Sequence, residues 1–509
     1  MGESLGAEGE SRVAIGTPVE EEQAASAYGA PPPDRRLRAG QLRFFRTVAE
    51  SVGVQGPTGG VVIGAAVLAS ISGGGTALVQ VVAAVAMGFV AYAFVIFTRG
   101  FNSAGSVYGF TGAVAGGVFG FFSAWTLLLV YVDFAGGVYA STADEAQSAF
   151  AALGVHLPWQ VLGVCAFVLV TLFAYLDIRA SSAIILALEG VSIVLVTVAC
   201  VVVLARGGYH GHAFSAAPFR PDGASLAVLG LGVVYAFSLF SGFEAATTLG
   251  EESKAPSKVI PLAVASSLVV VALYEIGVAA VVTNAYPSVK ALAAAPVPLV
   301  TVTDTYVAGW LGTLVAFGAV VSSFGAALAC ANGAARLLFA LGRDGFGPAS
   351  LRRTSVRTGA PVGALAWVAV VSLGAFAAFS WEHDAIRAVD IILTYGADLI
   401  IVAYILVVVA AIVYTIRSRM SPAKTIILLI GAGILGYVVK STFLPFPAAP
   451  YNWVALVAGV SLVVGLVLPV ASRRVREGVR SSPLLRLGTT RLLPGVAEGD
   501  GEARRTGAA

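Results

Sequence analysis

The chain is 509 residues long, with a net charge of +3 and a mean hydropathy of +0.88. Hydrophobic residues make up 58% of it and charged residues only 12%, whereas a soluble globular domain has about 25% charged residues. A water-soluble particle of this length cannot hide so much apolar surface. The composition therefore predicts an integral membrane protein whose apolar surface faces lipid, and no basic stripe interleaved with aromatic residues indicates nucleic-acid binding.

Twelve runs of mostly apolar residues are long enough to cross a bilayer, which takes about 20 residues. In chain order they cover residues 47–71, 76–98, 113–142, 157–176, 181–205, 224–250, 259–283, 308–341, 361–380, 388–416, 423–443 and 453–471. The third, eighth and tenth runs are long, so we expect tilted or protruding helices there. The pattern predicts an all-α membrane protein with twelve transmembrane helices.

Polar segments flank these runs. Residues 1–44 are acidic, then proline-rich and then basic, which predicts a disordered cytoplasmic tail. Residues 472–509 form a second polar tail. We therefore expect one transporter-sized domain over residues 45–471, in a multi-pass protein of the plasma membrane.

Lysine and arginine orient membrane proteins because they accumulate in cytoplasmic loops. With an even number of spans and a cytoplasmic N-terminus, most of these residues fall on the inner side. The outer segments then hold only Arg206, Arg220, Lys290, Arg387 and Lys440. This asymmetry predicts that both termini are cytoplasmic.

Two of the twelve runs contain helix-breaking residues. The first includes VQGPTGG at 54–60 and the sixth includes FSGFE at 240–244. Proline removes a backbone donor, paired glycines weaken a helix, and an unpaired peptide group in lipid costs several kcal/mol. Such breaks persist where they line a buried cavity, although glycine and proline are also simply common in membrane helices.

The two breaks occupy corresponding positions in two groups of five runs. Gly60 and Gly242 lie 182 residues apart, the spacing expected for an inverted repeat of five helices plus five. Residues 45–206 and 224–416 would form the repeats, and residues 423–471 two additional helices. Paired broken helices of this kind are the best sequence indicator of a substrate site in a transporter.

The stretch FSGFEAATTLGEESKAPSKVIPLA at 240–263 resembles the signature of the amino acid–polyamine–organocation superfamily of permeases. Three further stretches are similar to the same family: FTRGFNSAGSVYGF at 97–110, LDIRASSAIILALEG at 176–190, and ARLLFALGRDGFGPASLRRTSVRTGAPVGAL at 335–365. The similarity covers about residues 45–471. It implies a secondary transporter with twelve helices, a five-plus-five inverted-repeat core and two further helices.

Two positions depart from the family's pattern. The first break reads GPTGG, where the family usually has G-S-G-I-F. In the third helix, relatives often place an acid just before the tyrosine, whereas here the preceding position is Val130 and the acid, Asp133, follows Tyr131. Asp133 therefore occupies a neighbouring face of the helix.

The paired breaks predict a mid-membrane substrate site. We expect its walls to be Gln55, Gly56, Thr58, Gly59 and Gly60 of the first helix, Phe240, Ser241, Gly242 and Glu244 of the sixth, with Tyr131 or Asp133 of the third adding a side. Half-helix ends alone can hold a neutral amino acid, with N-termini facing the carboxylate and carbonyls facing the ammonium. Asp133 and Glu244, if both face the cavity, would instead favour a cationic amine.

Ionisable residues inside a membrane span are functional hypotheses by default. Glu244 follows the glycine break, so it either caps the second half of the helix or lines the cavity as a charge or proton acceptor. Glu275 and Asp398 are interpreted as lying near a helix end, facing water or neutralised by protonation. Arg336 either forms an intracellular gate with an acid such as Glu50, or snorkels to the surface.

The loop after the sixth helix, EESKAPSK at 251–258, is interpreted as solvated. Energy coupling is expected to rest on Glu189, deep in the fifth run. By the resemblance, this position faces the first break and the eighth helix, here Ser322 and Ser323. Burial disfavours the charged form of a carboxyl group, so Glu189 can bind and release a proton. One alternative is that the carboxylate and the two hydroxyls bind sodium as the coupling ion. Another is that Glu189 has a purely structural role.

The sequence thus predicts a secondary active transporter of amino acids or related amines, working by alternating access and driven by protons. A polyamine or organic amine exchanger is one alternative, and an ion channel is another, although no repeated carbonyl-filter sequence is present. No catalytic constellation indicates an enzyme, and no G-x-x-x-x-G-K-[ST] loop indicates ATP-driven pumping. The expected partners are a small-molecule substrate and the lipid bilayer, with no cofactor or metal other than the proton or sodium gradient.

Overall fold

The structure is a computed structural model that describes residues 37–101 and 103–482. Most of the predicted N-terminal tail and most of the C-terminal tail lie outside these residues. The described part is all-helical and contains no strand, only an isolated bridge between Leu42 and Ser253.

The membrane-length elements follow in chain order. They are α2 (Phe44–Gln55) with α3 (Pro57–Ser72), α4 (Thr76–Thr98), α6 (Gly117–Ala151), α7 (Trp159–Ala174), α8 (Ile178–Ala205), α9 (Leu226–Leu239) with the 3₁₀ helix η4 (Phe243–Leu249), α10 (Pro256–Ala285), α13 (Gly309–Arg343), α14 (Val362–Ala378), α15 (Ala385–Arg417), α16 (Pro422–Phe443) and α17 (Tyr451–Ala471). Shorter helices connect them: α5 (Val107–Ala115), η2 (Tyr209–Phe214), η3 (Ala217–Phe219), α11 (Val289–Ala293), α12 (Pro298–Tyr306), η5 (Ala349–Arg352) and α18 (Arg473–Ser481).

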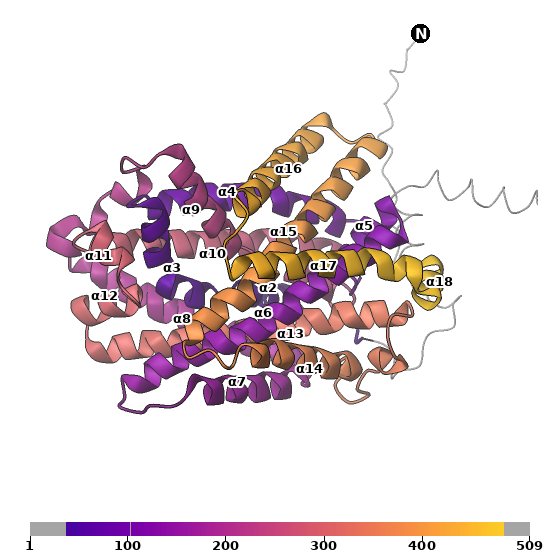
Figure 1. Cartoon of the computed structure of the whole chain (residues 1–509), viewed down its shortest axis with the longest axis horizontal. Helices are drawn as coiled ribbons and strands as arrows, with labels where there is room; N and C mark the ends of the chain where they lie inside the picture. Colours follow the sequence, from indigo (N-terminus) through magenta and orange to yellow (C-terminus); the bar gives the residue numbers. More distant parts are fainter. Residues whose placement is uncertain (1–36, 102, 483–509) are drawn as a thin grey trace, which may run out of the picture.

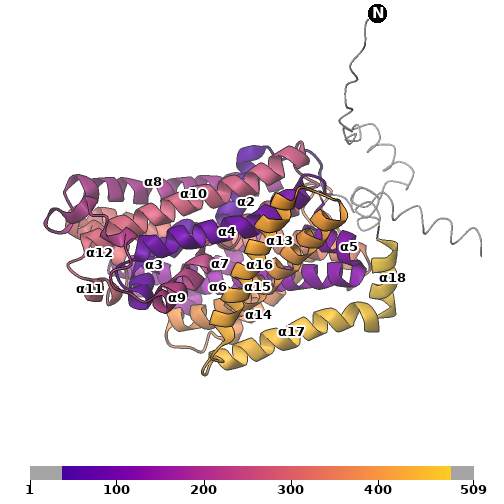
Figure 2. The ribbon, with the colours of Figure 1, turned by 90° about the horizontal axis from the view of Figure 1, so that it is seen from above.

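The long helices run roughly along one axis, which is horizontal in Figure 1. The two ends of the bundle differ in the connections that they carry. One end, which we call the tail end, carries residues 37–42, α5 and α18, and the opposite end, which we call the loop end, carries α11 and α12 (Figures 1 and 2). The two described ends of the chain therefore lie at the same end of the bundle.

Ten helical segments are long and apolar enough to cross a membrane, and two shorter apolar helices, Trp159–Ala174 and Val362–Ala378, accompany them in the described part of the chain. These twelve segments coincide with the twelve predicted runs, and the three expected to be long contain 35, 35 and 33 residues. The chain is a multi-pass membrane protein. The exact number of crossings and the inverted repeat stay predictions.

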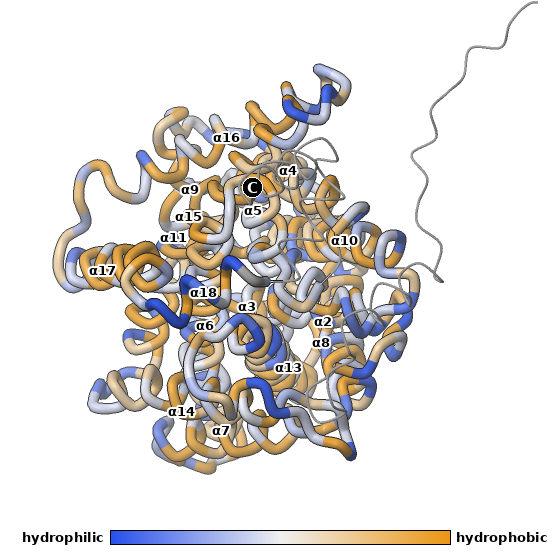
Figure 3. The backbone as a smooth tube through the Cα atoms, turned by 90° about the vertical axis from the view of Figure 1, so that its right-hand side faces the viewer, coloured by the Kyte–Doolittle hydropathy of each residue, from blue (hydrophilic) through white to orange (hydrophobic). Residues whose placement is uncertain are grey.

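The outer surface of the bundle shows why the composition is so apolar. On α8, Val191, Val194, Val198 and Val201 recur every three or four residues and are exposed, whereas Glu189 on the same helix is buried. Polar side chains thus face inward and valines outward, the reverse of a soluble helix. Figure 3, which looks onto the tail end, shows the hydrophobic helices, with hydrophilic residues gathered in connecting segments and α18.

Candidate substrate and coupling site

Both predicted helix breaks are present. Between α2 and α3, Gly56 adopts a left-handed conformation with φ of 51°, and Pro57 starts the second half. Between α9 and η4, Gly242 has φ of 110°. Proline is tolerated at the first position of a helix because its missing N–H has no partner there anyway. The GPTGG and FSGFE sequences therefore end one helix and begin another.

The two breaks lie directly against each other. Ser51 Oγ donates to the Phe243 carbonyl at 2.6 Å and accepts from the Ala246 amide at 2.9 Å, which satisfies backbone groups that the break leaves free. A Cβ atom on Gly242 would lie 2.6 Å from Val54 Cγ1. The first helix therefore fills the space beside Gly242, and the missing side chain allows the two breaks to pack closely.

Glu244 is fully buried and joins three helical elements. Its Oε1 accepts from the Tyr131 hydroxyl of α6 at 2.9 Å. Its Oε2 accepts from the Tyr404 hydroxyl of α15 at 2.7 Å and from the Gly242 amide at 3.1 Å. The carboxylate lies in the first turn of η4 and holds the break in shape, while its part in binding substrate stays a prediction.

The other predicted wall residues of the sixth helix, Phe240 and Ser241, are buried at the same break. Gln55, the last residue of α2, donates to the Ser51 carbonyl at 2.9 Å, and its own Oε1 has no partner in the described structure. Gln55 lies against Gly242 at the two breaks, whereas Thr58, Gly59 and Gly60 have other neighbours, so the substrate wall stays a prediction. A free amide oxygen at the end of a half-helix is an acceptor of the kind that an ammonium group needs.

Tyr131 and Asp133 point in different directions. Tyr131 reaches Glu244, whereas Asp133 Oδ2 accepts from the Gly396 amide of α15 at 3.0 Å. Asp133 therefore ties the third helix to the tenth. Its contact with substrate stays a prediction, and Tyr131 is the residue that contacts the break.

Glu189 lies where the resemblance places it. Ser322 Oγ of α13 donates toward both carboxylate oxygens, at 2.9 and 3.2 Å. Thr58 of α3 donates to Ser192 Oγ, one turn along α8 from Glu189, at 3.1 Å and is 3.0 Å from the Tyr274 hydroxyl. The buried carboxylate thus sits between the fifth and eighth helices and beside the first break.

The second predicted serine has a different partner. Ser323 Oγ donates to Glu145 Oε1 of α6 at 2.9 Å rather than to Glu189. A Cβ atom on Gly59 would lie 2.7 Å from Ser323 Oγ and 3.2 Å from Glu145 Oε1, so Gly59 allows both groups to reach α3. Glu145 was not predicted as a site residue, because the apolar run ends at residue 142 whereas α6 continues to Ala151.

Glu275 and Asp398 do not face water. Glu275 is fully buried ten residues before the end of α10, and Asp398 is 6% exposed within α15. The predicted runs 259–283 and 388–416 already extend past both acids, but an apolar run does not show which way a side chain on it faces. The interpretation of a water-facing helix end is therefore wrong for both.

The predicted gate arginine is buried and paired with a different acid. Arg336 donates to both oxygens of Glu252, with Nε 2.5 Å from Oε2, and Nη1 donates to the Asn332 carbonyl at 2.9 Å. The alternative of a snorkelling arginine is wrong. The expected partner, Glu50, instead accepts from Ser182 at 3.3 Å. Glu252 was interpreted as solvated, but it is only 2% exposed.

The segment 37–42, which was assigned to the tail, folds over this ion pair at the tail end. The amides of Gln41 and Leu42 donate to the Glu252 carbonyl at 2.7 and 2.9 Å, and Leu42 is fully buried. The folded part therefore begins before residue 45. The Glu252 backbone anchors this segment while its side chain binds Arg336.

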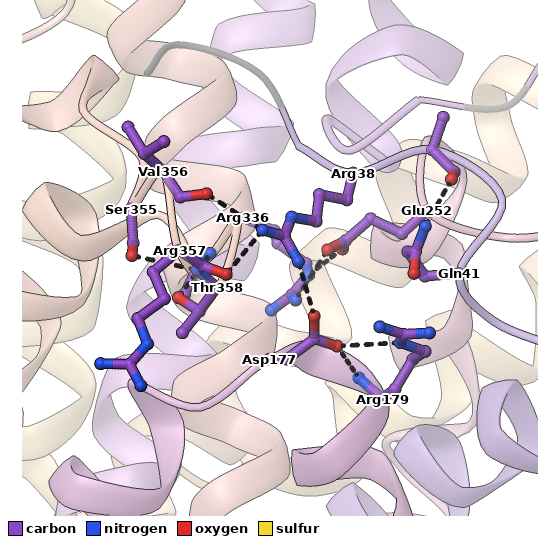
Figure 4. Close-up of polar contacts among 12 residues, drawn as sticks. Arg38, Gln41, Asp177, Arg179, Glu252, Arg336, Ser355, Val356, Arg357 and Thr358 are labelled. Carbon is purple, nitrogen blue, oxygen red and sulfur yellow. Dashed lines mark hydrogen bonds and ion pairs between the residues drawn. The ribbon is translucent and has the colours of Figure 1, made fainter. Parts of the chain in front are cut away.

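Arg38 fastens the same segment to two further connections (Figure 4). It donates to the carbonyls of Val356 and Arg357 at 3.0 and 2.5 Å, and it lies 3.3 Å from Asp177, which caps α8. The guanidinium group of Arg38 thus joins the connection before α8 to the connection before α14.

Glu251 is also paired rather than solvated. Arg343 of α13 lies 2.6 Å from its Oε1, which also accepts from the Ala104 amide at 3.1 Å. Burial by itself opposes ionisation, but Arg343 outweighs it and holds the pKa of Glu251 below its usual value. Lys254 and Lys258 of this loop are exposed as expected, as are Ala255 and Ser257 between them.

Comparisons with known proteins identify related transporters. The chain is 28% identical to the branched-chain amino acid permease BcaP of Bacillus subtilis over 55% of this chain and 63% of that protein. It is 27% identical to BcaP of Lactococcus lactis over 63% of this chain and 72% of that protein. It is also 27% identical to the methylthioribose transporter of Bacillus subtilis, over 60% of this chain and 68% of that protein.

A family model described as amino acid permease matches residues 46–471, which include both helix breaks, the Glu189 cluster and the Arg336–Glu252 pair. The family and these relatives are permeases and transporters rather than enzymes. The chain belongs to the amino acid permease family.

Proposed function

We propose that this protein is a secondary active transporter that carries amino acids or related amines across the plasma membrane by alternating access. The observation that carries the proposal is the direct contact between two broken helices at Gly56 and Gly242. Broken helices present free backbone donors and acceptors inside the membrane, where a zwitterionic substrate needs both. The names of the matched relatives, permeases for branched-chain amino acids and a methylthioribose transporter, support the same substrate range.

Proton coupling through Glu189 is the mechanistic part of the proposal. The carboxyl group is buried and is held by the Ser322 hydroxyl, so its charged form has few donors and no cation beside it in the described residues. Protonation from one side and release to the other would accompany rearrangement of α8, α13 and α3, which meet around it. Sodium held by the carboxylate and Ser322 is the competing coupling ion.

Alternating access requires that each end of the bundle can close. The buried Arg336–Glu252 pair and the Arg38 contacts close the tail end. We assign the tail end to the cytoplasm because the lysines and arginines of the sequence accumulate in the segments expected there. Opening toward the cytoplasm would then break these contacts and release the segment 37–42.

Uptake by proteoliposomes tests both parts. The full chain, its Glu189→Gln variant and the surface control Asp222→Asn are given a pH gradient without sodium, and uptake of radiolabelled L-leucine and L-lysine is measured. Asp222 is exposed with φ of 50°, a conformation that asparagine also adopts. We expect concentrative uptake by the wild type and the control, and exchange without concentration by Glu189→Gln.

Two results would contradict these expectations. Concentrative, pH-driven uptake by Glu189→Gln equal to that of the wild type would remove Glu189 from coupling. Flux that runs only downhill and does not saturate with substrate would support a channel instead of a transporter.

A further inference from the structure

Two buried carboxyl groups flank the first turn of α3, immediately after the break in the first helix. A Cβ atom on Gly60 would lie 3.7 Å from Glu275 Oε1 of α10, and one on Gly59 would lie 3.2 Å from Glu145 Oε1 of α6. Consecutive helix residues point about 100° apart, so the two carboxylates approach adjacent faces of the same turn. Because Gly59 and Gly60 have no side chains, the two carboxylates can approach the backbone of α3.

Glu275 has no partner. It is fully buried, and neither of its oxygens accepts a hydrogen bond or forms an ion pair in the described structure. Glu145 is only partly satisfied, because Ser323 and Ser141 donate to Oε1 while Oε2 has no partner. Buried acceptors without donors are rare in folded proteins and each requires an explanation. A ligand with several N–H donors would supply what these oxygens lack.

The surroundings add negative charge and no positive charge. Tyr235 of α9 lies within electrostatic range of both Glu275 and Asp390, and Tyr274 lies beside Glu275 on α10. Asp144 directly precedes Glu145 on α6, and Asp390 lies on α15 near the same Tyr235. No described lysine or arginine pairs with any of these four acids. The region beside α3 thus attracts cations.

We propose that Glu275, with Glu145 on the adjacent face, binds an ammonium group of a positively charged substrate. The inference rests on the proposed transport function and deepens it by naming the substrate class. A neutral amino acid brings one ammonium and one carboxylate, and two further carboxylates would repel the latter. A cationic amino acid or a diamine brings a second ammonium, which offers three N–H donors to the free oxygens. Charge balance therefore favours substrates with a net positive charge.

Competition experiments with the full chain in proteoliposomes test the assignment. Unlabelled L-leucine, L-lysine and putrescine compete with the uptake of radiolabelled L-leucine and L-lysine, for the wild type, Glu275→Gln, Glu145→Gln and the control Asp222→Asn. We expect the wild type to prefer L-lysine or putrescine to L-leucine. Glu275→Gln should raise the half-saturating concentration of the cations about tenfold or more while shifting that of leucine less than about twofold, because a hydrogen bond to a charged group is lost for the cations alone.

Glu145→Gln should reduce the preference for cations by a smaller factor, since the Ser323 and Ser141 hydroxyls already donate to one oxygen of Glu145. If Glu275→Gln is not monodisperse after purification, Glu275→Asp keeps the charge but withdraws it by one methylene, and an intermediate loss for the cations is expected. Equal losses for L-leucine and L-lysine, or a wild type without preference for cations, would overturn the assignment.

The thermal stability of the purified chain separates other outcomes. Stabilisation by L-lysine or putrescine that Glu275→Gln abolishes supports the assignment even if no uptake is seen, in which case the transport proposal alone fails. Stabilisation of the wild type by sodium chloride relative to choline chloride, lost in Glu275→Gln and unaffected by L-lysine, would show an inorganic cation at this place and overturn the inference.

Discussion

The buried glutamates of this protein differ in the donors that surround them. Glu244 receives hydrogen bonds from two tyrosine hydroxyls and one backbone amide, whereas both oxygens of Glu275 lack any partner. A satisfied buried acid stabilises its surroundings, and an unsatisfied one is costly. The same residue type therefore has opposite effects at two buried sites, one in η4 and one in α10.

Replacing these glutamates by methionine, which has a similar shape, should give opposite changes in stability. Glu244→Met leaves two buried tyrosine hydroxyls without their acceptor, and the Gly242 amide keeps only the Tyr404 hydroxyl at 3.3 Å, so we expect a loss of at least about 3 kcal/mol. Glu275→Met removes two unpaired acceptors, so we expect a gain of about 1 kcal/mol or more. The melting temperature of the detergent-purified chain, measured without substrate, checks both. A decrease for Glu275→Met would show that this carboxyl group has a donor in the resting protein.

Gly242 is required by its conformation and by its neighbour. An alanine there must adopt φ of 110° and place its Cβ atom 2.6 Å from Val54. Strain and overpacking together should cost about 2–5 kcal/mol in the free energy of unfolding. The matched control is Gly277→Ala on α10, where a Cβ atom meets nothing within 4 Å and helix propensity predicts a gain of up to about 1 kcal/mol. Equal effects of the two substitutions on melting temperature would contradict this reasoning.

At the scale of elements, charged contacts hold the tail end together with very different strengths. The Arg336–Glu252 pair has side chains only 3% and 2% exposed, whereas Arg38 beside Asp177 is 38% exposed. Water screens the exposed pair, and such pairs contribute about 0–1 kcal/mol. The buried pair instead leaves a charge without compensation when one partner is removed.

A double-mutant cycle on the buried pair should therefore be strongly non-additive. Arg336→Met or Glu252→Met alone should destabilise the chain by about 3–5 kcal/mol, and the double variant should recover most of that loss. The parallel cycle with Arg38→Met and Asp177→Asn should show coupling below about 1 kcal/mol. Thermal unfolding of the four variants in each cycle gives both coupling energies. Additive losses at Arg336 and Glu252 would mean that other groups, such as Glu50, neutralise the arginine.

Acid should release the second tail-end pair, Glu251 with Arg343. Because the pKa of Glu251 in the folded chain lies below its usual value of about 4.3, the pair stabilises the fold above that pH. The contribution is lost as the pH falls through the lower, folded-state pKa. The difference in melting temperature between the wild type and Glu251→Gln should thus be constant from about pH 5 to 8 and should shrink below about pH 4. A difference that grows on acidification would contradict the sign of the shift.

At the scale of the whole molecule, the contacts at the tail end connect segments far apart in the chain. The segment 37–42 pairs with the loop before α10, and Arg38 reaches the connections before α8 and α14. In the proposed alternating access these connections would separate together, because they lead into different helices, α10, α8 and α14. One weakened contact should therefore shift the balance between closed and open forms.

Arg38→Ala should increase access to the interior from the tail end. Cys330 is 1% exposed and lies on α13 between Ala326, which packs against Gly56, and Arg336, so it reports such opening. In a Cys165→Ser, Cys200→Ser background, we expect Arg38→Ala to raise the rate of maleimide labelling of Cys330 by about two- to fivefold, as suits a weak, partly exposed contact. The control Arg387→Ala removes an exposed arginine at the loop end. Equal labelling of both variants would mean that Arg38 does not hold the tail end closed.

The sequence alone determined the local features. Apolar runs of about 20 residues predicted each membrane-length helix closely, because a helix in lipid must satisfy its own backbone and present apolar side chains outward. The breaks at GPTGG and FSGFE were predictable for the same reason, since proline and left-handed glycine act on the backbone next to them. The position of Glu189 beside Ser322 followed from the family resemblance.

Only the tertiary structure decided which buried charges meet. The partner of Arg336 is Glu252 rather than Glu50, and Glu145 reaches the first break from beyond its apolar run. Hydropathy cannot show this, because it describes how each residue interacts with lipid or water and not which helix faces it. Side-chain partners depend on helix rotation and on contacts between residues far apart in the chain, here 84 and 178 positions, and that information exists only in the packed bundle.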